Sequence, residues 1–131
     1  MTRVQPVVAV VDDDLSVRRA LVRLLRTAGY HVEAFPSGDA LLAQLETCHA
    51  ACLILDVRMP GISGLDLPER LRASGFAIPF VFITGHGDGG MARRAMAAGA
   101  LRFLTKPFDD DELLRAVSEG VRQSQRVASA D

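Results

Sequence analysis

The sequence predicts a single α/β domain with a five-stranded parallel sheet and helices on both of its faces. Short apolar runs alternate with longer segments whose apolar residues recur at helical spacing. Several of the short runs are continuously apolar, which is typical of parallel strands buried on both faces. The 131 residues are enough for one domain with a sizeable core, and its strands are expected to join through right-handed crossovers.

Five segments carry the strand pattern. Residues 7–11 and 52–55 are continuous apolar runs and are predicted to be buried strands. Residues 79–83 form a third run of this kind, which Pro79 opens. Residues 31–35 alternate weakly between polar and apolar side chains and predict an edge strand. A short run at 101–104 completes the predicted sheet.

Five helices are predicted between and after these strands. The first ends at Gly29, and Ser37 is a suitable N-cap for the second. Pro68 falls near the start of the third helix, where its missing N–H costs little. Either Asp109 or Asp110 caps the last helix. The predicted helices cover residues 15–29, 37–45, 63–74, 91–98 and 110–122.

Composition limits the classes of function. The net charge is -1, so the chain has no overall basic excess with which to hold nucleic acid. No apolar run has the length of a membrane span and the N-terminus lacks a signal-peptide pattern, so a cytoplasmic location without membrane contact is expected. Cys48 and Cys52 flank His49, but no further ligand lies nearby in sequence, and neither a metal site nor a disulfide framework is predicted there.

Polar side chains follow four of the predicted strands. Asp12, Asp13 and Asp14 follow the first, Asp56 the third, Thr84 the fourth, and Lys106 the last. Lys106 is the only lysine among the 15 lysine and arginine residues. Its ammonium is a compact point charge on a flexible stem, whereas the arginine guanidinium is a planar fork. Because the carboxyl ends of parallel strands meet at one edge, these side chains are expected to share one cleft.

This set of groups predicts a magnesium-assisted phosphoryl-transfer site in which an aspartate is the acceptor. Clustered carboxylates repel unless they are protonated or bound to a cation, and Mg²⁺ prefers oxygen ligands. An aspartate can attack phosphorus, while Lys106 and the Thr84 hydroxyl would bind the phosphoryl oxygens. Helix capping is the simpler explanation for Asp13 or Asp14, but it does not account for Asp56 or Lys106.

Four motifs carry a family resemblance. They are Val11-Asp12-Asp13-Asp14, Leu55-Asp56-Val57-Arg58-Met59-Pro60-Gly61, Ile83-Thr84-Gly85 and Lys106-Pro107-Phe108. In this order and spacing, over residues 6–122, the chain resembles the receiver (CheY-like) domain of bacterial two-component response regulators. The resemblance implies a flavodoxin-like fold with strand order 2-1-3-4-5. Residues 1–122 are then the receiver domain, and residues 123–131 a polar tail or the start of a linker to an output domain.

The resemblance also implies a role for each site residue. Asp56 would accept a phosphoryl group from a phosphohistidine of a sensor histidine kinase. Mg²⁺, or Mn²⁺ in its place, would be held by Asp12, Asp13, Asp56 and the backbone carbonyl of Arg58. Lys106 would pair with the phosphate, and its peptide bond to Pro107 is expected to be cis.

Two further residues are implied as a conformational switch. Thr84 would move toward the phosphate and Phe103 would turn inward, although a phenylalanine in a short strand can also belong to the core. The shifts would alter the face formed by the helix at 91–98, the strand at 101–104 and the helix at 110–122. Arg58 and His86 flank the expected path of water and would tune the phosphate lifetime, unless they only form a solvated loop.

The output is the least constrained prediction. Residues 84–88 and 97–100 resemble the FixJ/LuxR-type transcription regulators, which implies a phosphorylation-dependent homodimer that reaches DNA only through a missing output domain. A stand-alone receiver that acts in a phosphorelay or docks on a protein is the alternative. A phosphatase of the haloacid dehalogenase type is disfavoured, because Arg58 occupies the position of its acid/base aspartate. The chain is therefore expected to catalyse only its own phosphorylation and dephosphorylation, and not to be an enzyme.

Overall fold

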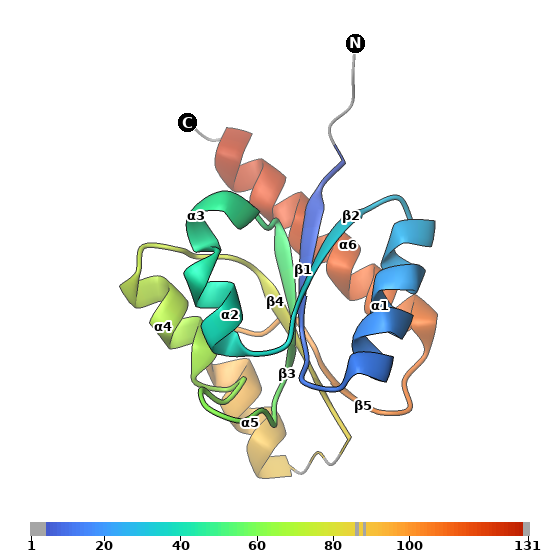
Figure 1. Ribbon diagram of the computed structural model, residues 1–131, viewed down its shortest axis with the longest axis vertical. Coiled ribbons are helices and arrows are strands. Elements are labelled where there is room, and N and C mark those ends of the chain that lie inside the picture. The colour runs from blue at the N-terminus through green and yellow to red at the C-terminus, as the bar shows by residue number, and fades with distance from the viewer. Residues whose placement is uncertain (1–4, 86, 88, 130–131) are drawn as a thin grey trace.

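The computed structural model describes residues 5–85, 87 and 89–129, and the side chains up to residue 126. Its centre is a parallel five-stranded sheet in the order β2-β1-β3-β4-β5, which confirms the predicted fold class (Figure 1). The strands are β1 (Val7–Val11), β2 (His31–Phe35), β3 (Cys52–Asp56), β4 (Phe80–Thr84) and β5 (Phe103–Thr105).

Helices cover both faces of the sheet. α1 and α6 pack on one face, and α2, α3, α4 and α5 pack on the other (Figure 1). Their bounds are α1 (Leu15–Thr27), α2 (Gly38–Ala43), α3 (Leu45–Cys48), α4 (Leu67–Ala73), α5 (Gly89–Ala97) and α6 (Asp110–Ser129).

The core consists of two apolar clusters, one on each side of the sheet. Successive residues of a strand point to opposite faces, so Val8 and Val10 pack toward α1 and α6, whereas Ala9 and Val11 pack toward the other helices. Both sets are fully buried. The continuous apolar sequence of β1 follows from this arrangement, because a strand covered on both faces has no solvent side.

Strand register brings the polar strand ends to one edge of the sheet. The pairs nearest the carboxyl ends are Val11 with Leu55, Asp56 with Ile83, and Thr84 with Thr105. Asp12 and Lys106 each continue directly from a paired strand. The prediction that these groups share one edge is therefore confirmed.

Several element boundaries differ from prediction. The single helix expected at 37–45 is interrupted at Gln44, whose N–H donates to the Leu41 carbonyl at 2.9 Å, so α2 ends in a tight turn before α3 begins. Glutamine is a good helix former, so the residue type at position 44 does not indicate that the helix is interrupted there. The structure therefore has six helices over the described residues, where five were predicted. Cys48 is a buried residue of α3.

The start of α4 and the end of α6 were also predicted wrongly. α4 begins at Leu67 because residues 63–66 form a turn, in which the Asp66 N–H donates to the Ser63 carbonyl at 3.1 Å. The Gly64 N–H donates to the Val57 carbonyl at 3.0 Å and so joins this turn to the residues that follow β3. Pro68 lies in the first turn of α4 as expected. α6 continues to Ser129, so the frayed tail expected from residue 123 is helical at least that far. Whether a linker begins there stays a prediction.

Of the helices among the described residues, none has the length and apolar character that a membrane span requires.

Candidate phosphoacceptor and metal site

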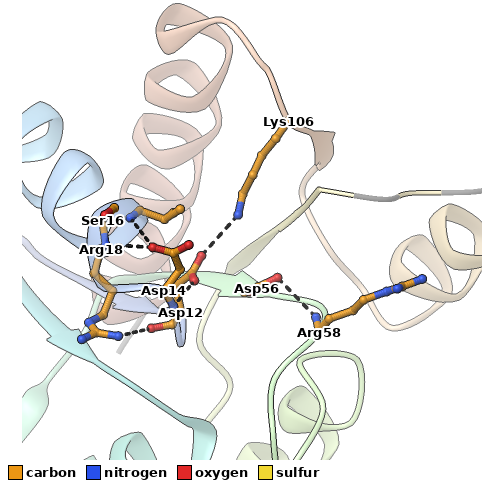
Figure 2. A network of polar contacts seen from close by, with 8 residues as sticks. Asp12, Asp14, Ser16, Arg18, Asp56, Arg58 and Lys106 are labelled. Atoms are coloured by element: carbon orange, nitrogen blue, oxygen red, sulfur yellow. Dashed lines mark hydrogen bonds and ion pairs between the residues drawn. The ribbon is translucent and has the colours of Figure 1, made fainter.

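Asp12 is fully buried at the end of β1, and most of its polar atoms are bonded. Its N–H donates to the Phe35 carbonyl at 3.1 Å, and its own carbonyl accepts from Arg18 Nη1 at 2.7 Å. Its Oδ1 accepts from the Asp14 N–H at 2.9 Å (Figure 2). Oδ2 has no hydrogen-bond partner among the described residues, and the Lys106 ammonium lies 3.5 Å away. Asp12 is thus a fixed carboxylate with one oxygen left for a cation.

The helix cap is Asp14 and not Asp13. Asp14 Oδ1 accepts from the Ser16 N–H at 2.8 Å and from the Val17 N–H at 3.2 Å, which completes the first turn of α1 (Figure 2). Capping therefore accounts for Asp14 alone. The exposed carboxylate of Asp13 is left to the cluster at the sheet edge.

Asp56 is 7% exposed at the end of β3, and its Oδ1 accepts from the Arg58 N–H at 3.2 Å. Burial raises the pKa of Asp56 from 3.8 to about 6, and the negative charges of Asp12 and Asp13 act in the same direction. The Arg58 N–H and the Lys106 ammonium oppose this rise. The Asp56 carboxylate is therefore held at an electrostatic cost that a bound cation would relieve.

The three carboxylates fit a divalent cation. One oxygen from each of Asp12, Asp13 and Asp56 lies within 4.8 Å of the others. The set consists of oxygen atoms only, which suits Mg²⁺, and Mn²⁺ accepts the same ligands. Together with Asp12 Oδ2, which has the Lys106 ammonium 3.5 Å away but no hydrogen bond, and with the raised pKa of Asp56, it defines a candidate metal centre.

Thr84 and Lys106 complete the edge. Thr84 is almost fully buried at the end of β4, and its carbonyl accepts from the Lys106 N–H at 2.8 Å. The Lys106 side chain extends toward Asp12 (Figure 2). The peptide bond between Lys106 and Pro107 is cis, as the family resemblance implied.

Phe103 is half-buried and packs against the core cluster on the α5 side. Gly87 lies directly beside it. An added Cβ at Gly87 would stand 2.9 Å from Phe103 Cε1, 2.9 Å from Thr105 Oγ1 and 3.1 Å from Thr84 Cγ2. Both predicted switch residues, Thr84 and Phe103, therefore border the position that a Cβ would occupy at Gly87, and a larger residue there would require side chains around it to shift. Sequence reasoning did not single out Gly87.

Of the two residues expected to tune the phosphate lifetime, Arg58 is among the described residues and His86 is not. Arg58 is exposed, and its side chain points away from Asp56 (Figure 2). His86 lies outside the described residues.

Sequence reasoning also missed two supports of the site. An added Cβ at Gly64 would overlap the Asp56 carbonyl oxygen and stand 2.8 Å from the carbonyl carbon, so Gly64 lets the following loop pack on the backbone of Asp56. Arg18 reaches back from α1 to the Asp12 carbonyl. A glycine after Met59-Pro60-Gly61 is a weak signal for the first, and no local pattern indicates the second.

The sheet order and the acidic edge define a receiver domain, and comparison with known proteins agrees. Residues 8–118 match the family described as the response regulator receiver domain. The chain belongs to this family, whose members are signalling switches of two-component systems.

The chain is also similar to individual named proteins. It is 47% identical over 124 residues to Nodulation protein W and 39% identical over 122 residues to the transcriptional regulatory protein FixJ, both of Bradyrhizobium diazoefficiens. The matches cover 95% and 93% of this chain but 55% and 60% of those proteins, so the chain spans little more than half their length. A low-resolution structure of the response regulator StyR superposes with a TM-score of 0.83 at 46% identity, covering 97% of this chain and 64% of that one.

Proposed function

We propose that Asp56 accepts a phosphoryl group from a phosphohistidine of a sensor histidine kinase, with Mg²⁺ held by Asp12, Asp13, Asp56 and the Arg58 carbonyl. The observation that carries the proposal is the buried position of Asp56, whose pKa is raised to about 6 beside two further carboxylates. A merely structural aspartate gains nothing from such a setting. For a nucleophile that works with a cation, the neighbouring carboxylates supply the cation's ligands and the burial excludes water from the reacting oxygen.

In the reaction, a carboxylate oxygen of Asp56 attacks phosphorus, and the bond between phosphorus and the histidine nitrogen breaks. Mg²⁺, when bound, neutralises charge on the phosphoryl oxygens. Lys106 would pair with one of these oxygens, and the position of its ammonium at the acidic cluster, 3.5 Å from Asp12 Oδ2, supports this role. Thr84 contributes its hydroxyl from the next strand end.

Phosphorylation would be transmitted through Thr84 and Phe103. The side chains of Thr84 and Phe103 border the same space beside Gly87, so a movement of Thr84 toward the phosphate would change the space beside the Phe103 ring. The surface altered by this change is the face of α5, β5 and α6 (the helix, strand and helix at 91–98, 101–104 and 110–122 of the sequence prediction). We propose that a phosphorylated homodimer forms through this face, and the dimerisation measurement below tests it.

The output we propose is control of a DNA-binding domain that follows the receiver, as the FixJ relative suggests. Arg58 and His86 remain proposed as residues that set how fast water reaches the phosphoryl group. The backbone of Arg58 lies beside Asp56, to which its N–H donates, whereas its exposed side chain points away from Asp56 and would have to turn back to act on water there. A stand-alone receiver in a phosphorelay is the competing output, and dimerisation separates the two.

The test is to incubate the chain with acetyl phosphate and Mg²⁺, weigh it intact, and size the same samples by chromatography. We expect a mass increase of one phosphoryl group on the parent and none on Asp56→Asn. A matching shift to dimer would favour the transcription output, and an adduct without a change in size would favour the stand-alone receiver. No adduct, under conditions that label a known receiver, would contradict the proposed chemistry, as would turnover of phosphate monoesters.

A further inference from the structure

We propose that Arg18 is a positioning residue for the metal-binding loop. Its guanidinium holds the Asp12 carbonyl, and this contact sets the orientation of the peptide that joins Asp12 to Asp13. The inference rests on the proposed function, because it concerns the carboxylates that would hold Mg²⁺.

Arg18 bonds both ends of the short segment between β1 and α1. Its backbone N–H donates to the Asp14 carbonyl at 3.0 Å, as part of the first turn of α1. Its side chain turns back, and Nη1 donates to the Asp12 carbonyl at 2.7 Å (Figure 2). The three aspartates are thereby tied to a helix at one end and to a guanidinium at the other.

The Asp12 carbonyl is the group that most needs this support. The Asp12 N–H is fixed by β2 and its Oδ1 by the Asp14 N–H. The carbonyl belongs to the next peptide, which leads to the exposed Asp13. Rotation of that peptide would move the Asp13 carboxylate out of the cluster, in which the three carboxylate oxygens lie within 4.8 Å.

Arg18 differs from its neighbours on the same helix. Arg19, Arg23 and Arg26 are exposed, whereas Arg18 is half-buried against the loop. A donor–acceptor distance of 2.7 Å is typical of a strong hydrogen bond from a charged group. Arg18 is therefore distinguished from the other arginines of α1 by its burial and by this bond.

Two effects on Mg²⁺ affinity have opposite signs, and an experiment can separate them. As a positive charge, Arg18 repels a bound cation, so its removal would tighten Mg²⁺ binding, and this effect would fade at high salt. As a positioning group it orders the ligands, so its removal would weaken binding at any salt concentration. Loss of a residue that orients metal ligands typically costs tenfold or more in affinity.

The experiment compares Arg18→Met, Arg18→Lys and the matched control Arg19→Met, which loses the same charge from the exposed position next to Arg18. Mg²⁺ affinity is measured by titration calorimetry at low and high salt. Hydrogen exchange of the Asp14 amide, which donates to Asp12 Oδ1, is measured by NMR in metal-free protein.

We expect Arg18→Met to bind Mg²⁺ about tenfold more weakly at both salt concentrations. Its Asp14 amide should exchange several-fold faster than in the parent. Arg19→Met should stay close to the parent in both measurements. Arg18→Lys keeps the charge and one donor, and should recover part of the lost affinity.

The proposal is overturned if Arg18→Met matches Arg19→Met in both measurements, or if it binds Mg²⁺ more tightly than the parent does. If Arg18→Met does not fold, Arg18→Ala takes its place with Arg19→Ala as its control, and equal Asp14 exchange rates in these two variants would overturn the proposal. A parent that binds no Mg²⁺ would contradict the proposed function. In that case the metal-free exchange rates still decide whether Arg18 orders the loop.

Discussion

The strands of the sheet have different kinds of side chain buried at their two ends. We call these ends the carboxyl edge, where the strands finish, and the amino edge, where they begin. At the carboxyl edge, Asp12, Asp56 and Thr84 are almost fully buried, and they are the buried polar side chains recorded over the described residues. At the amino edge, Cys52 of β3 packs so closely on α6 that a Cβ added at Gly120 would stand 2.7 Å from its sulfur. Burial also raises the pKa of Cys52 to about 12, so it is a neutral thiol within the core.

The amino edge and the carboxyl edge therefore contribute differently to the stability of the domain. The amino edge gains stability from close packing. The carboxyl edge holds carboxylates close together, with one buried oxygen lacking a hydrogen bond and with the pKa of Asp56 raised. Such a site is less stable than it would be without its charges, and we therefore expect a bound cation or a phosphoryl group to shift its conformation. Removing charge at one edge should stabilise the fold, and removing a contact at the other should destabilise it.

The largest effect should come from Gly64→Ala, which tests whether the carboxyl edge is also closely packed beneath its charges. The new Cβ would overlap the Asp56 carbonyl oxygen, so the backbone must move. We expect a loss of about 3 kcal/mol in the free energy of unfolding, measured with urea. Gly89→Ala is the control, since its Cβ would stand 3.8 Å from Arg93 Nη1, and it should be close to neutral. If the two substitutions had equal effects, the backbone around Asp56 would not be closely packed against Gly64.

The second effect is a stabilisation by Asp56→Asn in metal-free protein. The folded pKa, about 6, lies above the unfolded value of 3.8, so between them the folded state binds more protons and stability rises as pH falls. The destabilisation caused by the charge of Asp56 is fully present at pH values above the folded pKa, and it is absent at pH values below the unfolded pKa. We expect the variant to be roughly 1–3 kcal/mol more stable at neutral pH, with the difference disappearing in acid.

Urea unfolding across this pH range, without Mg²⁺, checks the prediction. Leu55→Val, a substitution in the apolar part of the same strand, should give a difference that does not vary with pH over this interval. A stabilisation of Asp56→Asn that is the same in acid would mean that its origin is not the charge of Asp56.

Most of the fold could be predicted from the sequence because the apolar strands specify it locally. The runs in β1, β3 and β4 are buried on both faces, and their ends place Asp12, Asp56 and Thr84 at one edge. The parallel order required the family resemblance in addition, because continuous apolar runs alone do not state which strands are neighbours.

The parts that sequence reasoning missed depend on contacts between distant residues. Gly64 and Gly87 are required by the side chains and backbone they touch, which lie on other elements. Arg18 is one of four arginines in α1, and its partial burial and its contact with the Asp12 carbonyl, which distinguish it from the other three, depend on the loop that lies before the helix. The roles of Asp56, Lys106 and Phe103 in phosphorylation remain predictions, since a position beside the site is not yet a measured function.

The smallest effect concerns the amino edge and the end of α6. Ser124 Oγ donates to the Ala51 carbonyl at 2.6 Å, a contact across 73 residues of sequence that ties the last turns of α6 to the start of β3. Ser124→Ala should cost about 1 kcal/mol, partly offset by the higher helix propensity of alanine. Gln125→Ala, at an exposed neighbouring position, should be neutral or slightly stabilising. Labelling of Asp56 by acetyl phosphate should be the same in both variants. A loss of labelling in Ser124→Ala alone would mean that the two edges are coupled through the sheet, and that the amino edge contributes to the response as well as to the stability of the fold.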